Sequence, residues 1–212
     1  QVTRPFDMQT HVYNQSHEDI PAFLERIRRT IDEYPGRFTV AEVGGPNPLP
    51  EMKAFTSGDI RLNSAYNFDF LYAEKITAEQ VKLSLRQWSG EYGEGWPSWA
   101  FSNHDAPRAV SRWAKEADRE HMCKLLMLLL VSLRGNAFIY QGEELALPQG
   151  YVAFEDLQDP EAITNWPHTL GRDGARTPMP WAEGADYGGF SSGGMWLKMD
   201  PNHESLAIDQ QN

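Results

Sequence analysis

The sequence has few of the features expected of membrane, nucleic-acid-binding or disulfide-rich proteins. Its single cysteine, Cys123, has no partner for an internal disulfide. Its longest apolar stretch, residues 125–131, is far shorter than the roughly 18 residues that a membrane-spanning helix needs. The 19 Lys and Arg residues form no basic run, and 30 Asp and Glu residues give a net charge of −11, which repels phosphates and anionic membranes. We therefore expect a soluble, cytoplasmic protein without a nucleic-acid or membrane partner.

Three kinds of site also find little support in the sequence. There is no Gly-rich phosphate-binding loop with a Lys, and the six histidines show no metal-ligand spacing, so we expect no cofactor and no structural or catalytic zinc site. Residues 189–193 fit the G-x-S-x-G pattern of a Ser nucleophile. That pattern works only as a turn between an apolar strand and a helix, whereas here a polar, Gly-rich stretch continues, so we do not expect a Ser nucleophile.

Helical and strand-like patterns alternate along the first part of the chain. Apolar spacing predicts helices over residues 16–36, 77–88 and 118–134, the first opened by a capping box of Ser16 and Asp19. Short apolar runs predict strands over residues 38–43, 66–68, 96–102 and 137–140. Strands alternating with helices of this length are typical of βα units, so the predicted fold class is α/β with a parallel sheet.

The pattern changes after Leu147. Residues 148–190 are rich in Gly, Pro, Asp and Trp and show no sustained period. A loop of this length in a compact domain is usually functional. We therefore divide the chain into an α/β part, residues 1–147, and a long loop region, residues 148–212, that contributes to a substrate pocket.

Hydrogen-bonding and charged residues follow three of the predicted strands. They are Glu42, then His104 and Asp105, then residues 141–144. The carboxyl ends of parallel strands form the site in βα folds, and two carboxylates in different environments suit cleavage of a glycosidic bond. Glu42 could equally be an ion-paired or exposed loop carboxylate, and His104 with Asp105 could be a turn or helix-cap pair.

Aromatic side chains are abundant, at 12% of residues, and several tryptophans fall in or beside predicted loops. Aromatic faces stack on sugar rings, so together they favour a carbohydrate ligand over a phosphorylated one, although a single tryptophan more often fills the core. These tryptophans are Trp96, Trp99, Trp166, Trp181 and Trp196.

Four segments, taken in order, resemble a known family. They are residues 40–44 (VAEVG), 101–108 (FSNHDAPR), 140–145 (YQGEEL) and 171–179 (GRDGARTPM). Together they are similar to the second half of the catalytic barrel of the α-amylase superfamily, glycoside hydrolase family 13, and most similar to bacterial α-glucosidases of the oligo-1,6-glucosidase type. The resemblance covers essentially the whole chain. It implies a partial (β/α)8 TIM barrel whose strands five to eight lie near residues 38–42, 64–69, 98–103 and 137–141.

The resemblance also implies roles for five residues. Glu42 would be the general acid/base, which protonates the glycosidic oxygen and then deprotonates water. Asp105 would hold sugar hydroxyls and stabilise the oxocarbenium-like transition state, with His104 binding the same glucose unit. Arg172 would contact that non-reducing glucose, and Phe68 could form a wall near the leaving group.

The sequence departs from the family pattern at the nucleophile. The family's nucleophile is an Asp two residues after an Arg, and no Arg-x-Asp occurs in this sequence. The strand-three Asp and His, the calcium-type loop, the last helix and the C-terminal β-domain of the family also have no counterpart. We therefore expect a partial chain that is inactive alone and whose partner is the missing N-terminal half of the barrel.

The predicted function is that of an enzyme in carbohydrate metabolism. For the intact protein we expect a retaining α-glucosidase that releases glucose from short α-linked glucosides such as maltose or isomaltose, with no cofactor. The alternatives are a transglycosylase or isomerase of the same superfamily, or a catalytically silent relative of the transporter heavy-chain kind. The sequence leaves open the α-1,4 or α-1,6 preference, metal dependence and oligomeric state.

Overall fold

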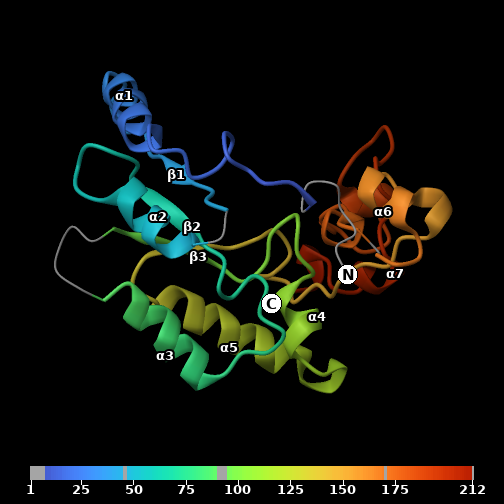
Figure 1. Ribbon diagram of the computed structural model, residues 1–212. Coiled ribbons are helices and arrows are strands. Elements are labelled where there is room, and N and C mark those ends of the chain that lie inside the picture. Colours follow the sequence, from blue (N-terminus) through green and yellow to red (C-terminus); the bar gives the residue numbers. More distant parts are fainter. Residues whose placement is uncertain (1–7, 45–46, 90–94, 170, 212) are drawn as a thin grey trace. The chain divides into compact units, whose positions relative to one another are not determined.

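The computed structural model, drawn in Figure 1, describes residues 8–44, 47–89, 95–169 and 171–211. The chain divides into two compact units. Unit 1 comprises Gln1–Phe70, Ile76–Trp99 and Leu133–Phe138. Unit 2 comprises Leu71–Lys75, Ala100–Ser132 and Ile139–Asn212. The sheet belongs to unit 1, except for the last residue of one strand, and the Gly- and Pro-rich segment belongs to unit 2.

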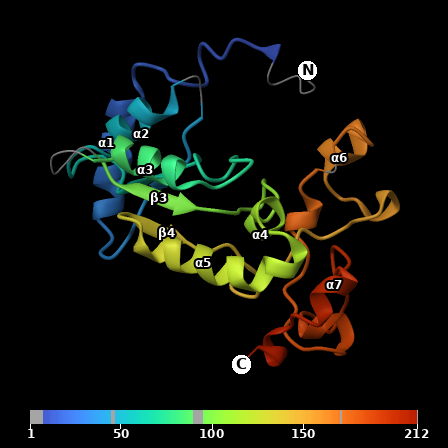
Figure 2. The ribbon, with the colours of Figure 1, turned by 90° about the horizontal axis from the view of Figure 1, so that it is seen from below.

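A four-stranded sheet forms the centre of unit 1. Its strands are β1 (Val40–Ala41), β2 (Ser64–Asn67), β3 (Pro97–Ala100) and β4 (Asn136–Phe138), and their spatial order is the order in the chain. β1 pairs in parallel with β2, and β2 with β3, while β4 lies beside β3 (Figure 2). Parallel neighbours that are consecutive in sequence require crossover connections, as βα units provide. The predicted α/β class with a parallel sheet is confirmed.

Among its described residues, unit 1 also contains the helices α1 (Ile20–Asp32), α2 (Pro48–Thr56) and α3 (Ala78–Gln87). α2 contacts both β2 and α1. The Oγ1 atom of Thr77 caps α3 by accepting a hydrogen bond of 3.2 Å from the backbone N–H of Gln80, as the Thr-x-x-Gln spacing predicts. α3 therefore begins where the sequence places it.

In unit 1, one expectation is wrong and one helix was not predicted. α1 begins at Ile20 without a capping box, because Ser16 has a φ of +55° and its hydroxyl donates to Glu51 instead. α2 was not predicted at all, since Pro48 and Pro50 look like helix breakers. They lie in the first turn of the helix, where a backbone N–H has no intrahelical acceptor to lose.

Unit 2 contains one long helix and several short ones. The long helix is α5 (Arg119–Ser132), which confirms the helix predicted from the apolar run, and the shorter ones are α4 (Ala109–Trp113), α6 (Pro160–Asn165) and α7 (Pro201–Glu204). The short 3-10 turns are η2 (Glu116–Asp118), η3 (Phe154–Asp156), η4 (Asp173–Ala175), η5 (Asp186–Gly189) and η6 (Ile208–Gln210). A small apolar core of Leu145, Leu147 and Met179 packs against Leu206 and Ile208.

The α5 helix is apolar on more than one side. It buries Cys123, Leu126 and Leu130, and the thiol of Cys123 donates to the carbonyl oxygen of Glu143 at 2.9 Å. Leu125 and Leu128 remain more than half exposed. Within the described residues, neither α5 nor any other helix combines the length and the apolar character required to cross a membrane.

Candidate active site

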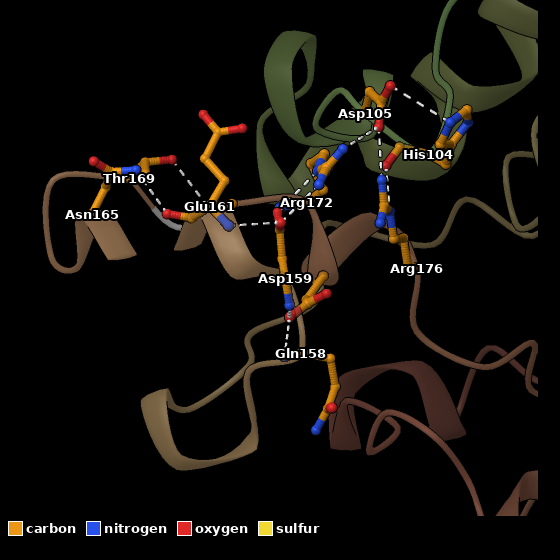
Figure 3. A network of polar contacts seen from close by, with 11 residues as sticks. His104, Asp105, Gln158, Asp159, Glu161, Asn165, Thr169, Arg172 and Arg176 are labelled. Carbon is orange, nitrogen blue, oxygen red and sulfur yellow. Dashed lines mark hydrogen bonds and ion pairs between the residues drawn. The ribbon is translucent and has the colours of Figure 1, made fainter. Parts of the chain in front are cut away.

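The predicted site residues are divided between the two units. In unit 1, Glu42 directly follows β1 and is exposed, and Phe68 directly follows β2. In unit 2, His104 and Asp105 lie in the turn after β3, and Arg172 precedes the η4 turn. The structure brings His104, Asp105 and Arg172 together into one polar network, shown in Figure 3.

A tight turn after the buried strand β3 places His104 and Asp105. The Oδ1 atom of Asn103 accepts hydrogen bonds from the backbone N–H groups of Asp105, at 2.8 Å, and Ala106, at 2.9 Å. This is the turn that the Asn-x-Asp sequence favours. The interpretations of this segment as a turn and as a site are therefore compatible, because the turn holds the two side chains in position.

Asp105 is the centre of the network. Its Oδ1 atom accepts a 2.7 Å hydrogen bond from Nη2 of Arg176 and lies 3.4 Å from Nη1 of Arg172. Its Oδ2 atom lies 3.5 Å from Nε2 of His104 (Figure 3). The side chain of His104 is 61% exposed and that of Asp105 31% exposed, so both remain open to a ligand. A carboxylate beside an imidazole and guanidinium donors can bind vicinal sugar hydroxyls.

Arg176 is a member of this network that the sequence reasoning missed. Besides its bond to Asp105, its Nε donates to the backbone carbonyl oxygen of His104 at 2.8 Å. It therefore fixes both residues of the turn after β3. The available signal was its place four residues after Arg172, inside the segment that carries the family resemblance.

Asp159 is a second residue that the sequence reasoning missed. Its side chain is fully buried, and its Oδ1 and Oδ2 atoms accept hydrogen bonds of 2.8 and 3.0 Å from Nη2 and Nε of Arg172. These bonds from Arg172 lower the pKa of Asp159 to about 2, and Asp159 in turn raises the pKa of Arg172 above its usual value. No local pattern indicates this pair, because Asp159 before Pro160 predicts only a helix cap.

A buried guanidinium supports the segment that carries Arg172 and Arg176. Arg108 is almost fully buried and donates from Nη1 to the carbonyl oxygen of Gln141 at 2.5 Å and from Nη2 to that of Ala175 at 3.3 Å. Its guanidinium lies 5.4 Å from the ring centre of Tyr140, whose hydroxyl also donates to Ala175. Burial lowers the pKa of Arg108. These bonds fix the backbone of η4 between the two arginines.

Unit 1 contains an aromatic cluster around Tyr66, the residue on which the charge of Glu42 acts. Burial raises the pKa of Tyr66 on β2, and the negative charge of Glu42 adds to that effect. The Tyr66 ring stacks on Phe68 at a centroid distance of 6.1 Å with an interplanar angle of 8°, and it contacts Phe138 on β4. Glu42 is therefore an exposed carboxylate whose charge acts on the hydroxyl of Tyr66.

The sequence matches a family model and several known proteins over nearly its whole length. A family model described as the catalytic domain of alpha amylase matches residues 3–212. A probable alpha-glucosidase of Rhizobium meliloti (strain 1021) is 44% identical over 209 residues, which cover 98% of this chain and 38% of that protein. An oligo-1,6-glucosidase of Halalkalibacterium halodurans is 29% identical, over 93% of this chain and 40% of its own length.

Solved structures share the fold of this chain as well. The crystal structure of an alpha-glucosyl transfer enzyme, XgtA, superposes with a TM-score of 0.87 at 40% sequence identity, over 97% of this chain and 38% of that protein. The chain thus spans about two fifths of the length of the relatives that it matches.

Proposed function

Because this chain belongs to the α-amylase family, glycoside hydrolase family 13, we propose that the whole protein is a retaining α-glucosidase that releases glucose from the non-reducing end of short α-glucosides. Its parallel sheet is part of the (β/α)8 barrel of these enzymes. Maltose and isomaltose are the proposed substrates. Residues 1–147 supply barrel strands, and residues 148–212 line the glucose pocket.

The observation that carries the proposal is the open carboxylate of Asp105 among three nitrogen donors. His104, Arg172 and Arg176 surround it, and all four lie in the segments that carry the family motifs. Asp105 accepts hydrogen bonds from sugar hydroxyls and stabilises the positive charge that develops on the ring in the transition state. His104 and Arg172 hold the same glucose unit, and Phe68 forms a wall near the leaving group.

Glu42 carries the proton in this mechanism. As the acid, it protonates the glycosidic oxygen while a carboxylate nucleophile forms a covalent bond to the anomeric carbon and the alcohol departs. As the base, it then removes a proton from water, which attacks the anomeric carbon, displaces the nucleophile and releases glucose. No Arg-x-Asp occurs in these 212 residues, so the nucleophile in this mechanism comes from another part of the whole protein.

A second candidate function is glucosyl transfer. The structural relative XgtA is an alpha-glucosyl transfer enzyme at 40% identity. In that reaction, Glu42 would deprotonate a sugar hydroxyl instead of water, and the hydroxyl oxygen would attack the glucosyl-enzyme. Products made from maltose distinguish the two candidates, since hydrolysis yields only glucose and transfer yields longer oligosaccharides.

The test is turnover of maltose and p-nitrophenyl α-glucoside by the whole protein and by its Glu42→Gln variant. We expect Glu42→Gln to lower turnover of maltose by about 10²–10⁴-fold, the usual contribution of a general acid or base. Azide should partly restore turnover of the nitrophenyl glucoside by forming α-glucosyl azide, because an anionic nucleophile needs no base. Glu79→Gln on the outside of α3 is the matched control and should turn over maltose normally.

Two results would contradict these assignments. Near-normal turnover of maltose by Glu42→Gln would remove Glu42 from the acid/base role. Failure of the unmodified protein to form either glucose or transfer products from both substrates would contradict the proposed function itself.

A further inference from the structure

Asp159 is a buried carboxylate that touches none of the groups proposed to bind glucose except Arg172. It is fully buried, and its two oxygens accept four hydrogen bonds. Three of them come from Arg172, through its backbone N–H, its Nε and its Nη2, and the fourth comes from the backbone N–H of Glu161. Both edges of the carboxylate are therefore used to hold one arginine and the first turn of α6.

The bonds to Asp159 leave one nitrogen of the Arg172 guanidinium pointing elsewhere. Nε and Nη2 face Asp159, and Nη1 lies 3.4 Å from Oδ1 of Asp105 (Figure 3). A guanidinium is planar and rigid, so fixing one edge fixes the direction of the remaining nitrogen. The position of Asp159 thus determines where Nη1 of Arg172 points.

The backbone of Asp159 is in turn held by a second buried carboxylate, that of Asp173. The buried side chain of Asp173 accepts hydrogen bonds from the backbone N–H groups of Gln158, at 2.7 Å, and Asp159, at 2.8 Å. Residues 158–159 and 171–173 therefore bind each other in both directions, and we call this pair of segments the clasp. Gly171 lets them approach, since a Cβ atom there would lie 2.8 Å from Oδ2 of Asp159.

We propose that Asp159 is a positioning residue that acts through Arg172 and keeps Arg172 from collapsing onto Asp105. This inference rests on the proposed function. At 3.4 Å, Arg172 makes a longer contact with Asp105 than Arg176 does at 2.7 Å. A guanidinium released from Asp159 would form a bidentate pair with Asp105 and occupy the oxygens that bind sugar hydroxyls. Asp159 therefore keeps both Asp105 and Arg172 available to the non-reducing glucose.

The kinetic test compares Asp159→Asn, Arg172→Ala and the double variant in the whole protein, with maltose as substrate. An amide at residue 159 places donors against the donors of Arg172, so the pair breaks. We expect Asp159→Asn to raise KM by about 10²-fold, the scale of a misplaced binding group, with a smaller change in kcat. The double variant should be no worse than Arg172→Ala, because Asp159 acts only through Arg172.

Asp200→Asn is the matched control. Asp200 is also buried and also caps a short helix, α7, but it accepts from the backbone N–H groups of Tyr151 and Asn202. Because this carboxylate has only a structural role, Asp200→Asn should lower the unfolding temperature and leave KM for maltose unchanged. An unchanged KM for Asp159→Asn, or additive losses in the double variant, would overturn the inference.

Crystal structures of the whole protein and its Asp159→Asn variant separate this inference from the proposed function. We expect the guanidinium of Arg172 to move onto Asp105 in the variant, whatever the protein hydrolyses. An unmoved guanidinium would overturn the inference even if α-glucosidase activity is present. Absence of glucose and transfer products together with a displaced guanidinium would contradict the proposed function and support the positioning role of Asp159.

Discussion

The buried pair of Asp159 and Arg172 connects single-residue chemistry to stability. Hydrogen bonds from Arg172 are the largest cause that lowers the pKa of Asp159 from 3.8 to about 2. A carboxyl group with a lower pKa in the folded than in the unfolded chain stabilises the fold fully above pH of about 4. That contribution is lost as the pH falls through the folded pKa. The shift corresponds to about 2 kcal/mol of the free energy of unfolding.

We therefore predict that the whole protein is more stable than its Asp159→Asn variant by an amount that depends on pH. The difference in their free energies of unfolding should be about 2 kcal/mol smaller at a pH of about 2 than at a pH of about 5. Urea unfolding at a series of pH values measures it. Glu120→Gln is the control, because the exposed pair of Glu120 and Lys124 contributes little at ordinary salt concentrations. Parallel pH profiles for the protein and Asp159→Asn would show that the pair does not titrate as described.

Local patterns found some site residues and not others. Asn103 and Asp105 lie two positions apart, so their turn is encoded by adjacent residues and could be predicted. Asp159 and Arg172 are 13 positions apart, and their pairing depends on how the intervening chain folds back. Arg176 reaches Asp105 across 71 positions. No short spacing encodes such contacts, which is why sequence reasoning missed Asp159 and Arg176.

At the scale of elements, the helices with either a side-chain cap or a long apolar run were predicted best. α3 has the Thr77 cap, and the apolar run predicted α5 to within two residues at each end. α2 was missed because its prolines lie in the first turn, where they are tolerated. β1, β3 and β4 are shorter than their predicted runs, whereas β2 begins two residues earlier than predicted. Backbone hydrogen bonds nevertheless continue past the strand ends, since Thr39 accepts from Ser64 and Trp96 accepts from Ala65.

The clasp gives a prediction at this scale, because Gly171, next to Arg172, packs closely against Ala162 of α6. Gly171 has a φ of +64°, and a Cβ atom there would lie 2.4 Å from Cβ of Ala162. Gly184 has nearly the same φ, +67°, with nothing within 4 Å of its Cβ position. Gly184→Ala should cost only the left-handed backbone penalty of about 1 kcal/mol. Gly171→Ala should cost about 2 kcal/mol more, because α6 must shift away.

Unfolding of the two glycine variants of the whole protein in urea measures this difference. Because the shift of α6 carries Asp159 with it, Gly171→Ala should also raise KM for maltose, whereas Gly184→Ala should not. Equal losses of stability in the two variants would mean that the clasp has room for a methyl group.

At the scale of the whole molecule, the family and the parallel α/β class could be predicted, because four motif segments follow one another in the order of the strands. The division at residue 147 stays a prediction, as do the roles of Glu42, Phe68, His104, Asp105 and Arg172. The reason is physical: βα patterning determines which elements form, but it does not encode how separate segments come together around a ligand. The chain also spans only about two fifths of its relatives.

The outer face of α5 provides a test at this largest scale. Three large apolar side chains on this face, Leu125, Leu128 and Val131, are each more than half exposed. They are spaced three residues apart, so they lie along one side of the helix. Large apolar side chains grouped in this way usually pack against another surface. Since helices of a (β/α)8 barrel pack beside their neighbours around the sheet, we predict that another part of the whole protein covers this face.

The comparison of Leu128→Gln with Lys124→Gln in the whole protein tests this cover. Burying a leucine side chain stabilises a fold by about 2 kcal/mol, so Leu128→Gln should lower the free energy of unfolding by about that amount. Lys124 lies one turn earlier on the same helix with its side chain 73% exposed, and Lys124→Gln should change the stability by less than about 0.5 kcal/mol. Hydrogen exchange of α5 in the whole protein should slow to the rate of global unfolding if the face is covered. An equally small loss from both substitutions would mean that this apolar face stays in water, and that the barrel of the whole protein is arranged differently around α5.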